Sequence, residues 1–174
     1  VQQPRLWWPN GYGAADLHTM TLSFKAHGKL SDQRKERFGI REITYEISAL
    51  DSTGHLRRVE VSPTEAELLG SPSVVDQTHE GFRETPDGWV PTLIPATEHS
   101  LAIKDLTDLR SAPFLVVRVN GVRIAIKGGS WGMDDMRKRV SRERLEPYFR
   151  LHKEANVNMI RNWMGQDTEE TFYD

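Results

Sequence analysis

A group of side chains suited to polar recognition lies after an apolar run near residue 130. The group follows the pair Gly128-Gly129, and its members are Trp131, Asp134 and Asp135. An aromatic ring offers a flat apolar face, and a carboxylate accepts hydrogen bonds. Because a sugar presents both apolar ring faces and hydroxyl groups, this stretch predicts a saccharide-binding site.

A predicted β-hairpin positions this group. The runs Leu115–Val119 and Val122–Ile126 are rich in β-branched residues, and the pair Asn120-Gly121 separates them. Asn-Gly is a preferred pair for the two positive φ angles of a type I′ turn. We therefore expect two antiparallel strands directly before the glycine pair.

A helix and a further strand are expected after this group. Apolar residues recur at helical spacing between Ser141, a candidate N-cap, and Asn156. The run Val157–Trp163 then has the composition of a buried strand. Strand, helix and strand in this order predict a βαβ unit, which favours a parallel sheet or a barrel.

The preceding part of the chain predicts antiparallel β structure. Leu17–Phe24 alternates like a half-buried strand, and Ile43–Leu50 can form a hairpin with Leu56–Val61. Lys29–Arg37 is charged and is interpreted as a solvated turn with a following edge. Residues 62–109 are punctuated by Gly and Pro, so we expect short strands or an elaborated lobe there.

The change of pattern predicts two domains. Residues 1–112 would form the antiparallel β domain, with 62–109 as its elaborated region, and residues 113–174 would begin a βα domain. The expected boundary lies near Ala112-Pro113. The chain starts without Met and stops after a structured segment, so we interpret it as a piece of a longer protein.

The composition excludes several classes of function. Twenty-three Lys and Arg against 25 Asp and Glu give a net charge of -2, which provides no broad field for nucleic acid or an anionic membrane. No apolar run approaches the roughly 18 residues of a membrane span.

The chain has no cysteine, which excludes disulfides and leaves the compartment open. None of the six histidines has metal-ligand spacing, and Gly128-Gly129 lacks the Lys-Ser/Thr of a phosphate loop. We expect neither metal nor cofactor.

Four segments carry a resemblance to a known family. They are LWWPNGYG (Leu6–Gly13), FGIRE (Phe38–Glu42), VNGVRIAIKGGSWGMDD (Val119–Asp135) and NMIRNWMGQDTEETFYD (Asn158–Asp174). Their order resembles the family 2 glycoside hydrolases, on the side of the β-mannosidases and exo-β-glucosaminidases. The resemblance implies a mainly β fold, in which an immunoglobulin-like antiparallel β-sandwich precedes the first βαβ unit of a (β/α)₈ barrel.

The resemblance also implies roles for the polar residues. Asp135 matches the Asp that hydrogen-bonds substrate hydroxyls at the non-reducing-end subsite, with Asp134 and Trp131 beside it. Trp163 matches an aromatic residue lining the same pocket, and Arg161 matches an Arg that orients neighbouring carboxylates. A barrel places such residues together at the C-terminal ends of its strands. The expected partner is an oligosaccharide or glycoside.

The implied reaction needs residues outside this chain. Retaining glycosidases use two carboxyl groups about 5 Å apart. In this family both are glutamates on later barrel strands, and the acid/base follows an Asn; the sequence contains no Asn-Glu pair. We expect a retaining exo-β-glycosidase acting on β-mannosides or β-glucosaminides, of which this piece holds no catalytic residue and is inactive alone. Its open barrel edges favour self-association.

Other interpretations stay open from the sequence. Trp163 is alternatively a packing residue, and Asp134 and Asp135 are alternatively turn or helix caps. Trp7 and Trp8 fit packing, either between two domains or at the end of a sandwich core, as well as sugar contact. Arg161 needs a carboxylate partner in either role if it is buried. A non-catalytic carbohydrate-binding or structural β-sandwich, or a protein-interaction sandwich, are the alternatives to an enzyme. Gly132-Met133 and Met164–Gln166 depart from the mannosidase pattern, which leaves the sugar undetermined.

Overall fold

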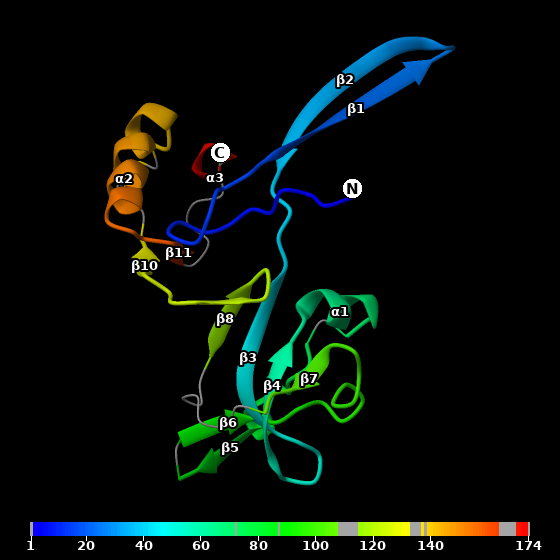
Figure 1. Cartoon of the computed structure of the whole chain (residues 1–174), viewed down its shortest axis with the longest axis vertical. Coiled ribbons are helices and arrows are strands. Elements are labelled where there is room, and N and C mark those ends of the chain that lie inside the picture. The colour runs from blue at the N-terminus through cyan, green and yellow to red at the C-terminus, as the bar shows by residue number, and fades with distance from the viewer. Residues whose placement is uncertain are drawn as a thin grey trace. The chain divides into compact units, whose positions relative to one another are not determined.

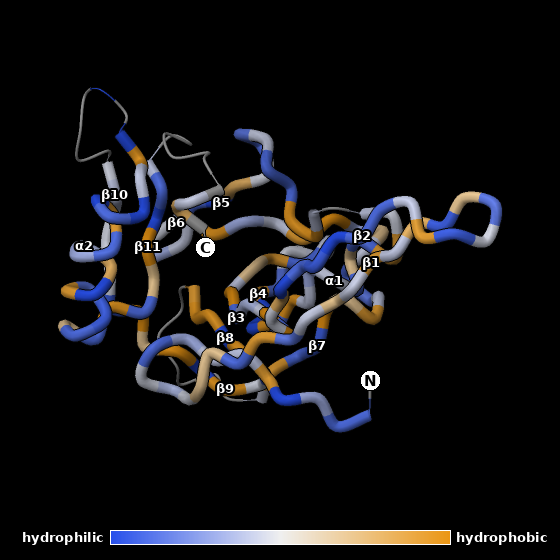
Figure 2. Tube along the Cα trace, turned by 90° about the horizontal axis from the view of Figure 1, so that it is seen from above, coloured by the Kyte–Doolittle hydropathy of each residue, from blue (hydrophilic) through white to orange (hydrophobic). Residues whose placement is uncertain are grey.

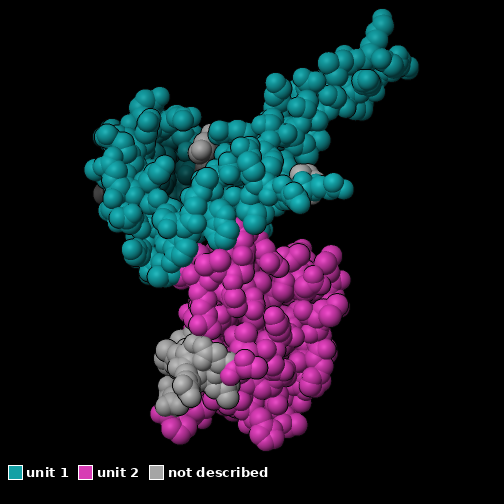
Figure 3. All heavy atoms as spheres, in the orientation of Figure 1, with its two compact units in different colours: residues 1–41, 125–174 teal, residues 42–124 magenta. Residues whose placement is uncertain are grey.

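The computed structural model of the chain describes residues 2–71, 73–86, 88–107, 115–132, 137, 139–163 and 170–173. The chain divides into two compact units, residues 1–41 with 125–174 (unit 1) and residues 42–124 (unit 2), coloured separately in Figure 3. The boundary expected near Ala112-Pro113 lies outside the described residues. The described sheets are mostly antiparallel, which agrees with the predicted mainly β class and is consistent with a β-sandwich.

Unit 2 is built on a five-stranded antiparallel sheet with the order β7-β4-β3-β8-β9 (Figure 1). Its strands are β3 (Ile43–Leu50), β4 (Leu56–Val61), β7 (Ile103–Asp105), β8 (Val116–Val119) and β9 (Val122–Ile124). Both predicted hairpins, β3-β4 and β8-β9, are confirmed. Asn120 and Gly121 have φ angles of 49° and 77°, the positive pair that a type I′ turn requires.

The stretch 62–109 holds short elements, in agreement with the sequence. Besides β7 these are α1 (Pro63–Leu68), the 3₁₀ turn η1 (His79–Gly81), β5 (Phe82–Thr85) and β6 (Gly88–Pro91). β5 and β6 form a separate antiparallel hairpin. The Ser62 side chain caps α1 by accepting a hydrogen bond from the backbone N–H of Glu65.

The two faces of the main sheet differ in chemistry. One face packs an apolar core around Ala49, Val59 and Leu93, each 0% exposed. Figure 2 shows hydrophobic residues along β3 and β8. The other face buries the carboxylate of Glu46, which β-strand alternation directs away from the core.

Three guanidinium groups surround Glu46. Its carboxylate oxygens lie 3.3 Å from Nη2 of Arg58, 3.3 Å from Nη1 of Arg118 and 2.7 Å from Nε of Arg123. A second carboxylate, Glu60, lies 3.1 Å from the same Arg118 nitrogen. Since these arginines belong to β4, β8 and β9, one buried carboxylate on β3 connects three neighbouring strands.

Unit 1 contains a hairpin of β1 (His18–Ala26) and β2 (Lys29–Phe38). Two predictions were wrong here. Lys29–Arg37 is strand and not a turn, because backbone pairing with β1 does not depend on apolar side chains. The expected half-buried strand is exposed, with Phe24 65% and Leu22 50% accessible, because β1 and β2 form a two-stranded sheet.

The C-terminal part of unit 1 contains a βαβ unit. It comprises β10 (Gly128–Trp131), α2 (Arg142–Glu154) and β11 (Met159–Asn162), and it is followed by α3 (Glu170–Tyr173). Ser141 occupies the predicted N-cap position of α2. β10 and β11 pair in parallel, from Gly128 opposite Met159 to Trp131 opposite Asn162.

Candidate functional site

The ends of the parallel strands β10 and β11 bring parts of the predicted site together. Ser130 lies opposite Arg161, and Trp131 lies opposite Asn162. Paired residues of neighbouring strands share a face, and successive residues alternate between faces. The pairing therefore directs Arg161 and Trp131 to opposite faces of the two-stranded sheet.

Arg161 and Trp163 share one face. The guanidinium carbon of Arg161 lies 5.1 Å from the centre of the Trp163 indole, a cation–π geometry. Nη1 of Arg161 donates a long hydrogen bond of 3.5 Å to Oγ of Ser130. Trp163 is 43% exposed. The pair therefore presents a flat aromatic ring and a cation to solvent at the end of a strand.

The expected carboxylate partner of Arg161 is absent from the described part of the chain. Its side chain is exposed, and the described ion pairs do not include it. Asp134 and Asp135, the predicted substrate-binding carboxylates, lie outside the described residues, as do residues 164–169. Their roles stay predictions.

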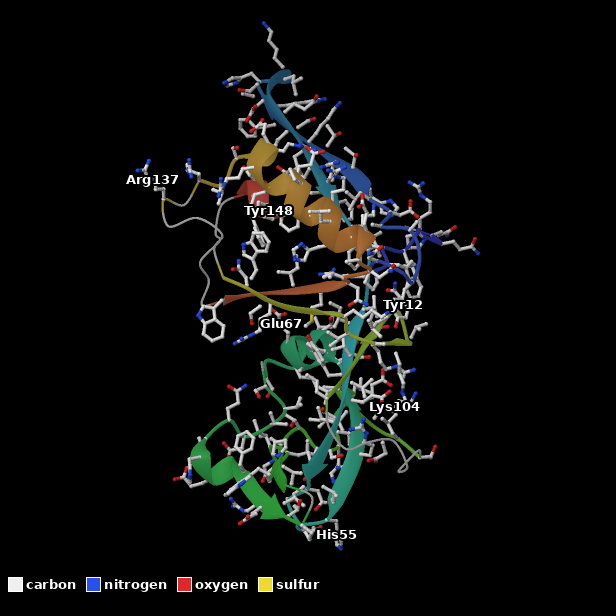
Figure 4. All side chains as sticks on the ribbon, turned by 90° about the vertical axis from the view of Figure 1, so that its left-hand side faces the viewer. Tyr12, His55, Glu67, Lys104, Arg137 and Tyr148 are labelled. Atoms are coloured by element: carbon white, nitrogen blue, oxygen red, sulfur yellow. The ribbon has the colours of Figure 1, made fainter. Side chains whose placement is uncertain are left out.

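Trp131 lies on the helix side and packs against α2. Its ring stacks on Phe149 with centroids 5.7 Å apart, and it makes edge contacts with His152 and with Tyr148. Tyr148 is labelled on α2 in Figure 4. Phe172 of α3 adds a fourth ring, 6.0 Å away. Only 9% of Trp131 is exposed. The structure therefore does not bring Trp131 together with Arg161 and Trp163.

The N-terminal aromatic segment makes structural contacts within unit 1. Nδ2 of Asn10 donates to the backbone oxygen of Lys153, in the last turn of α2, at 2.8 Å and to that of Val157, just after α2, at 3.2 Å. The Tyr12 hydroxyl accepts the backbone N–H of Ala125 at 2.7 Å. These bonds connect the N-terminal segment of unit 1 to its C-terminal part. The only sign of them in the sequence is the Pro-Asn-Gly turn.

Glycines pack directly on the two tryptophans of this segment. A Cβ added to Gly39 would lie 2.9 Å from Trp7, and one added to Gly13 would lie 2.8 Å from Trp8. The guanidinium of Arg41 lies 4.5 Å from the Trp7 ring centre. Both rings also border an open pocket of about 530 Å³ against α2 and β11. These contacts favour the packing interpretation of Trp7 and Trp8.

Carboxyl groups with shifted pKa values in unit 2 occupy turns. Hydrogen bonds from the Ser52 hydroxyl and backbone lower the pKa of Glu98 below its usual value. Hydrogen bonds from the Thr53 hydroxyl and the His55 backbone do the same for the pKa of Asp51. Among the described residues no cluster of His, Asp and Glu could hold a metal ion, and no described helix could span a membrane.

Comparison with known proteins finds similarity to glycoside hydrolases. A family model described as glycosyl hydrolases family 2 matches residues 1–41. A mannosylglycoprotein endo-β-mannosidase of Lilium longiflorum is 25% identical over 94% of the chain. These partial matches support the prediction that the chain is a fragment of a family 2 glycoside hydrolase.

Two further relatives match shorter segments. An exo-β-D-glucosaminidase of Hypocrea jecorina is 30% identical over 30% of the chain, and a β-mannosidase B of Emericella nidulans is 44% identical over 24%. The chain spans 11%, 6% and 5% of the lily, Hypocrea and Emericella proteins, respectively. No solved structure matches the chain significantly.

Proposed function

We propose that this family 2 chain is part of a retaining exo-β-glycosidase that removes β-linked mannosyl or glucosaminyl residues from non-reducing ends. The observation that carries the proposal is the Arg161–Trp163 pair, an exposed aromatic plate beside a cation at the end of a parallel strand. An indole face suits the apolar face of a sugar, and a guanidinium suits the carboxylates that bind its hydroxyls.

In this proposal β10, α2 and β11 are the first βαβ unit of a (β/α)₈ barrel, and residues 1–112 are mainly an immunoglobulin-like sandwich. Asp135 and Asp134 bind substrate hydroxyls beside Trp163, and Arg161 orients these carboxylates. Trp131 borders the pocket through its strand while its ring packs on α2. The two catalytic glutamates belong to later strands, so the isolated chain is inactive.

An endo mode of action is the second candidate. The relative that matches over 94% of this chain is named as an endo-β-mannosidase of mannosylglycoproteins. The other two relatives described above are named as a β-mannosidase and an exo-β-glucosaminidase. The two modes differ in whether a free non-reducing sugar is required.

The test is to assay the intact protein that carries this chain on three kinds of substrate. These are p-nitrophenyl β-D-mannoside, p-nitrophenyl β-D-glucosaminide and a mannosylated glycopeptide. Release of p-nitrophenol supports the exo proposal, and cleavage of the glycopeptide alone supports the endo mode. Binding of glycans without hydrolysis of any substrate would instead support a non-catalytic carbohydrate-binding module.

A further inference from the structure

An exposed aromatic face occurs in unit 2, on a hairpin that contributes no residue to the site at the ends of β10 and β11. On the hairpin β5-β6, Phe82 pairs with Pro91 and Glu84 pairs with Trp89. Paired residues share a face, and alternate residues along a strand return to it. Phe82, Glu84, Trp89 and Pro91 therefore lie on one face, which we call the β5-β6 platform.

The platform faces solvent while the opposite face of the hairpin is anchored. Trp89 is 59% exposed and Phe82 is 39% exposed, whereas Val90, which alternates with Trp89, is 6% exposed. The backbone N–H of Thr92 donates to the carbonyl of Gly81 at 2.7 Å, and the Thr85 hydroxyl donates to the carbonyl of Gly88 at 2.7 Å. Hydrogen bonds and the burial of Val90 therefore fix the backbone that carries the two aromatic rings.

The size and chemistry of the platform argue against a protein partner. Two strands of four residues cover roughly 13 by 10 Å, whereas a stable protein interface buries about 800 Å² on each partner. Glu is also depleted in the cores of protein interfaces. A carboxylate between exposed apolar rings instead matches a ligand whose own surface alternates apolar faces and hydroxyl groups.

We propose that the β5-β6 platform is an accessory binding site for a β-linked oligosaccharide. Trp89 and Phe82 are diagonal neighbours on the two paired strands. Such positions lie about 7–8 Å apart across the hairpin, so the two rings can contact successive sugar units. Glu84 accepts hydrogen bonds from hydroxyl groups at the edge of the sugar. The choice of a β-mannan or chitosan ligand rests on the proposed function, but the platform requires no catalytic residue.

The test is binding of β-1,4-mannohexaose and of chitosan hexamer to the full 174-residue chain, measured by calorimetry. Trp89→Ala should raise the dissociation constant at least 10-fold, and Glu84→Gln should raise it about 3- to 10-fold. The control Leu101→Ala removes an apolar side chain that is 83% exposed elsewhere and should leave binding unchanged. Circular dichroism confirms that each variant is folded.

Three results would overturn the proposal. They are equal affinity of Trp89→Ala and wild type, absence of binding to either glycan, and self-association of the chain that Trp89→Ala removes. Failure of the proposed enzymatic function gives a different pattern, namely glycan binding that depends on Trp89 in an intact protein that hydrolyses no β-glycoside. In an active intact protein, Trp89→Ala should leave hydrolysis of small p-nitrophenyl glycosides unchanged.

Discussion

The indole of Trp131 and the phenyl ring of Phe149 are stacked, with their planes inclined by 13° and their centroids 5.7 Å apart. This contact joins the end of β10 to the middle of α2. The tryptophan after the glycine pair therefore has a packing role, because its ring faces the helix. We expect the βαβ unit to depend on this aromatic packing.

Replacement of Trp131 by Ala should therefore destabilise unit 1. We expect a loss of about 3–5 kcal/mol in the free energy of unfolding, as for other buried aromatic residues. Urea denaturation followed by circular dichroism measures it. Trp163→Ala is the matched control, and its cost should be smaller because Trp163 is 43% exposed. Equal losses in the two variants would contradict the packing role of Trp131.

The two glycines of β10 should respond differently to a methyl group. A Cβ on Gly128 would overlap the backbone oxygen of Met159, whereas one on Gly129 meets nothing within 4 Å. Gly128→Ala must displace β11, with a cost of at least about 1–3 kcal/mol. Gly129→Ala should be nearly neutral in the same denaturation experiment. A neutral Gly128→Ala would show that β10 and β11 are not paired in this register.

The Glu46 cluster makes a prediction for unit 2. Glu46→Gln removes a buried charge that three arginines share, one of which, Arg58, is itself only 5% exposed. Breaking a buried ion pair in this way costs about 3–5 kcal/mol. The exposed Glu67 on α1 (Figure 4) provides the control Glu67→Gln, which should change stability by less than about 0.5 kcal/mol. Similar midpoints of denaturation for the two variants would exclude the role assigned to Glu46.

The turn carboxyl Glu98 predicts a dependence of stability on pH. Hydrogen bonds from Ser52 lower its pKa in the folded state, so its contribution is present above the unfolded pKa and is lost as the pH falls through the folded pKa. Ser52→Ala removes the donor at 2.7 Å and should raise the Glu98 pKa toward its ordinary value of about 4.3. NMR titration of the Glu98 carboxyl carbon measures this. An unchanged pKa would mean that the hydroxyl does not stabilise the charged form.

Local patterns predicted most of the strands. Asn120-Gly121 indicated β8-β9 because few residue pairs accept two positive φ angles, and alternation indicated β3 because one of its faces is buried. The β1-β2 hairpin was missed in part because its turn is His27-Gly28, with φ angles of 49° and 78°. The charged run Lys29–Arg37 follows this uncommon turn pair, and it lacks the alternation of apolar and polar residues that predicts a strand.

The site was harder to predict than the fold. The resemblance implied that Trp131 lies near Arg161 and Trp163, but the direction of each ring depends on the pairing register of β10 and β11, which no local pattern encodes. The platform of Phe82 and Trp89 lies in the stretch where Gly and Pro weaken the periodicity. Its exposure follows from the anchoring of Val90 in unit 2, a tertiary effect.

The most direct test of the proposed function is kcat/KM for p-nitrophenyl β-D-mannoside or β-D-glucosaminide, measured on the intact protein and on its Asp135→Ala variant. We expect hydrolysis by the wild type and a loss of about 10- to 150-fold in the variant, the range for one hydrogen bond to a charged group. Hydrolysis that does not depend on Asp135 would contradict its role in substrate binding. Absence of hydrolysis of every β-glycoside by the intact protein would contradict the proposed function itself.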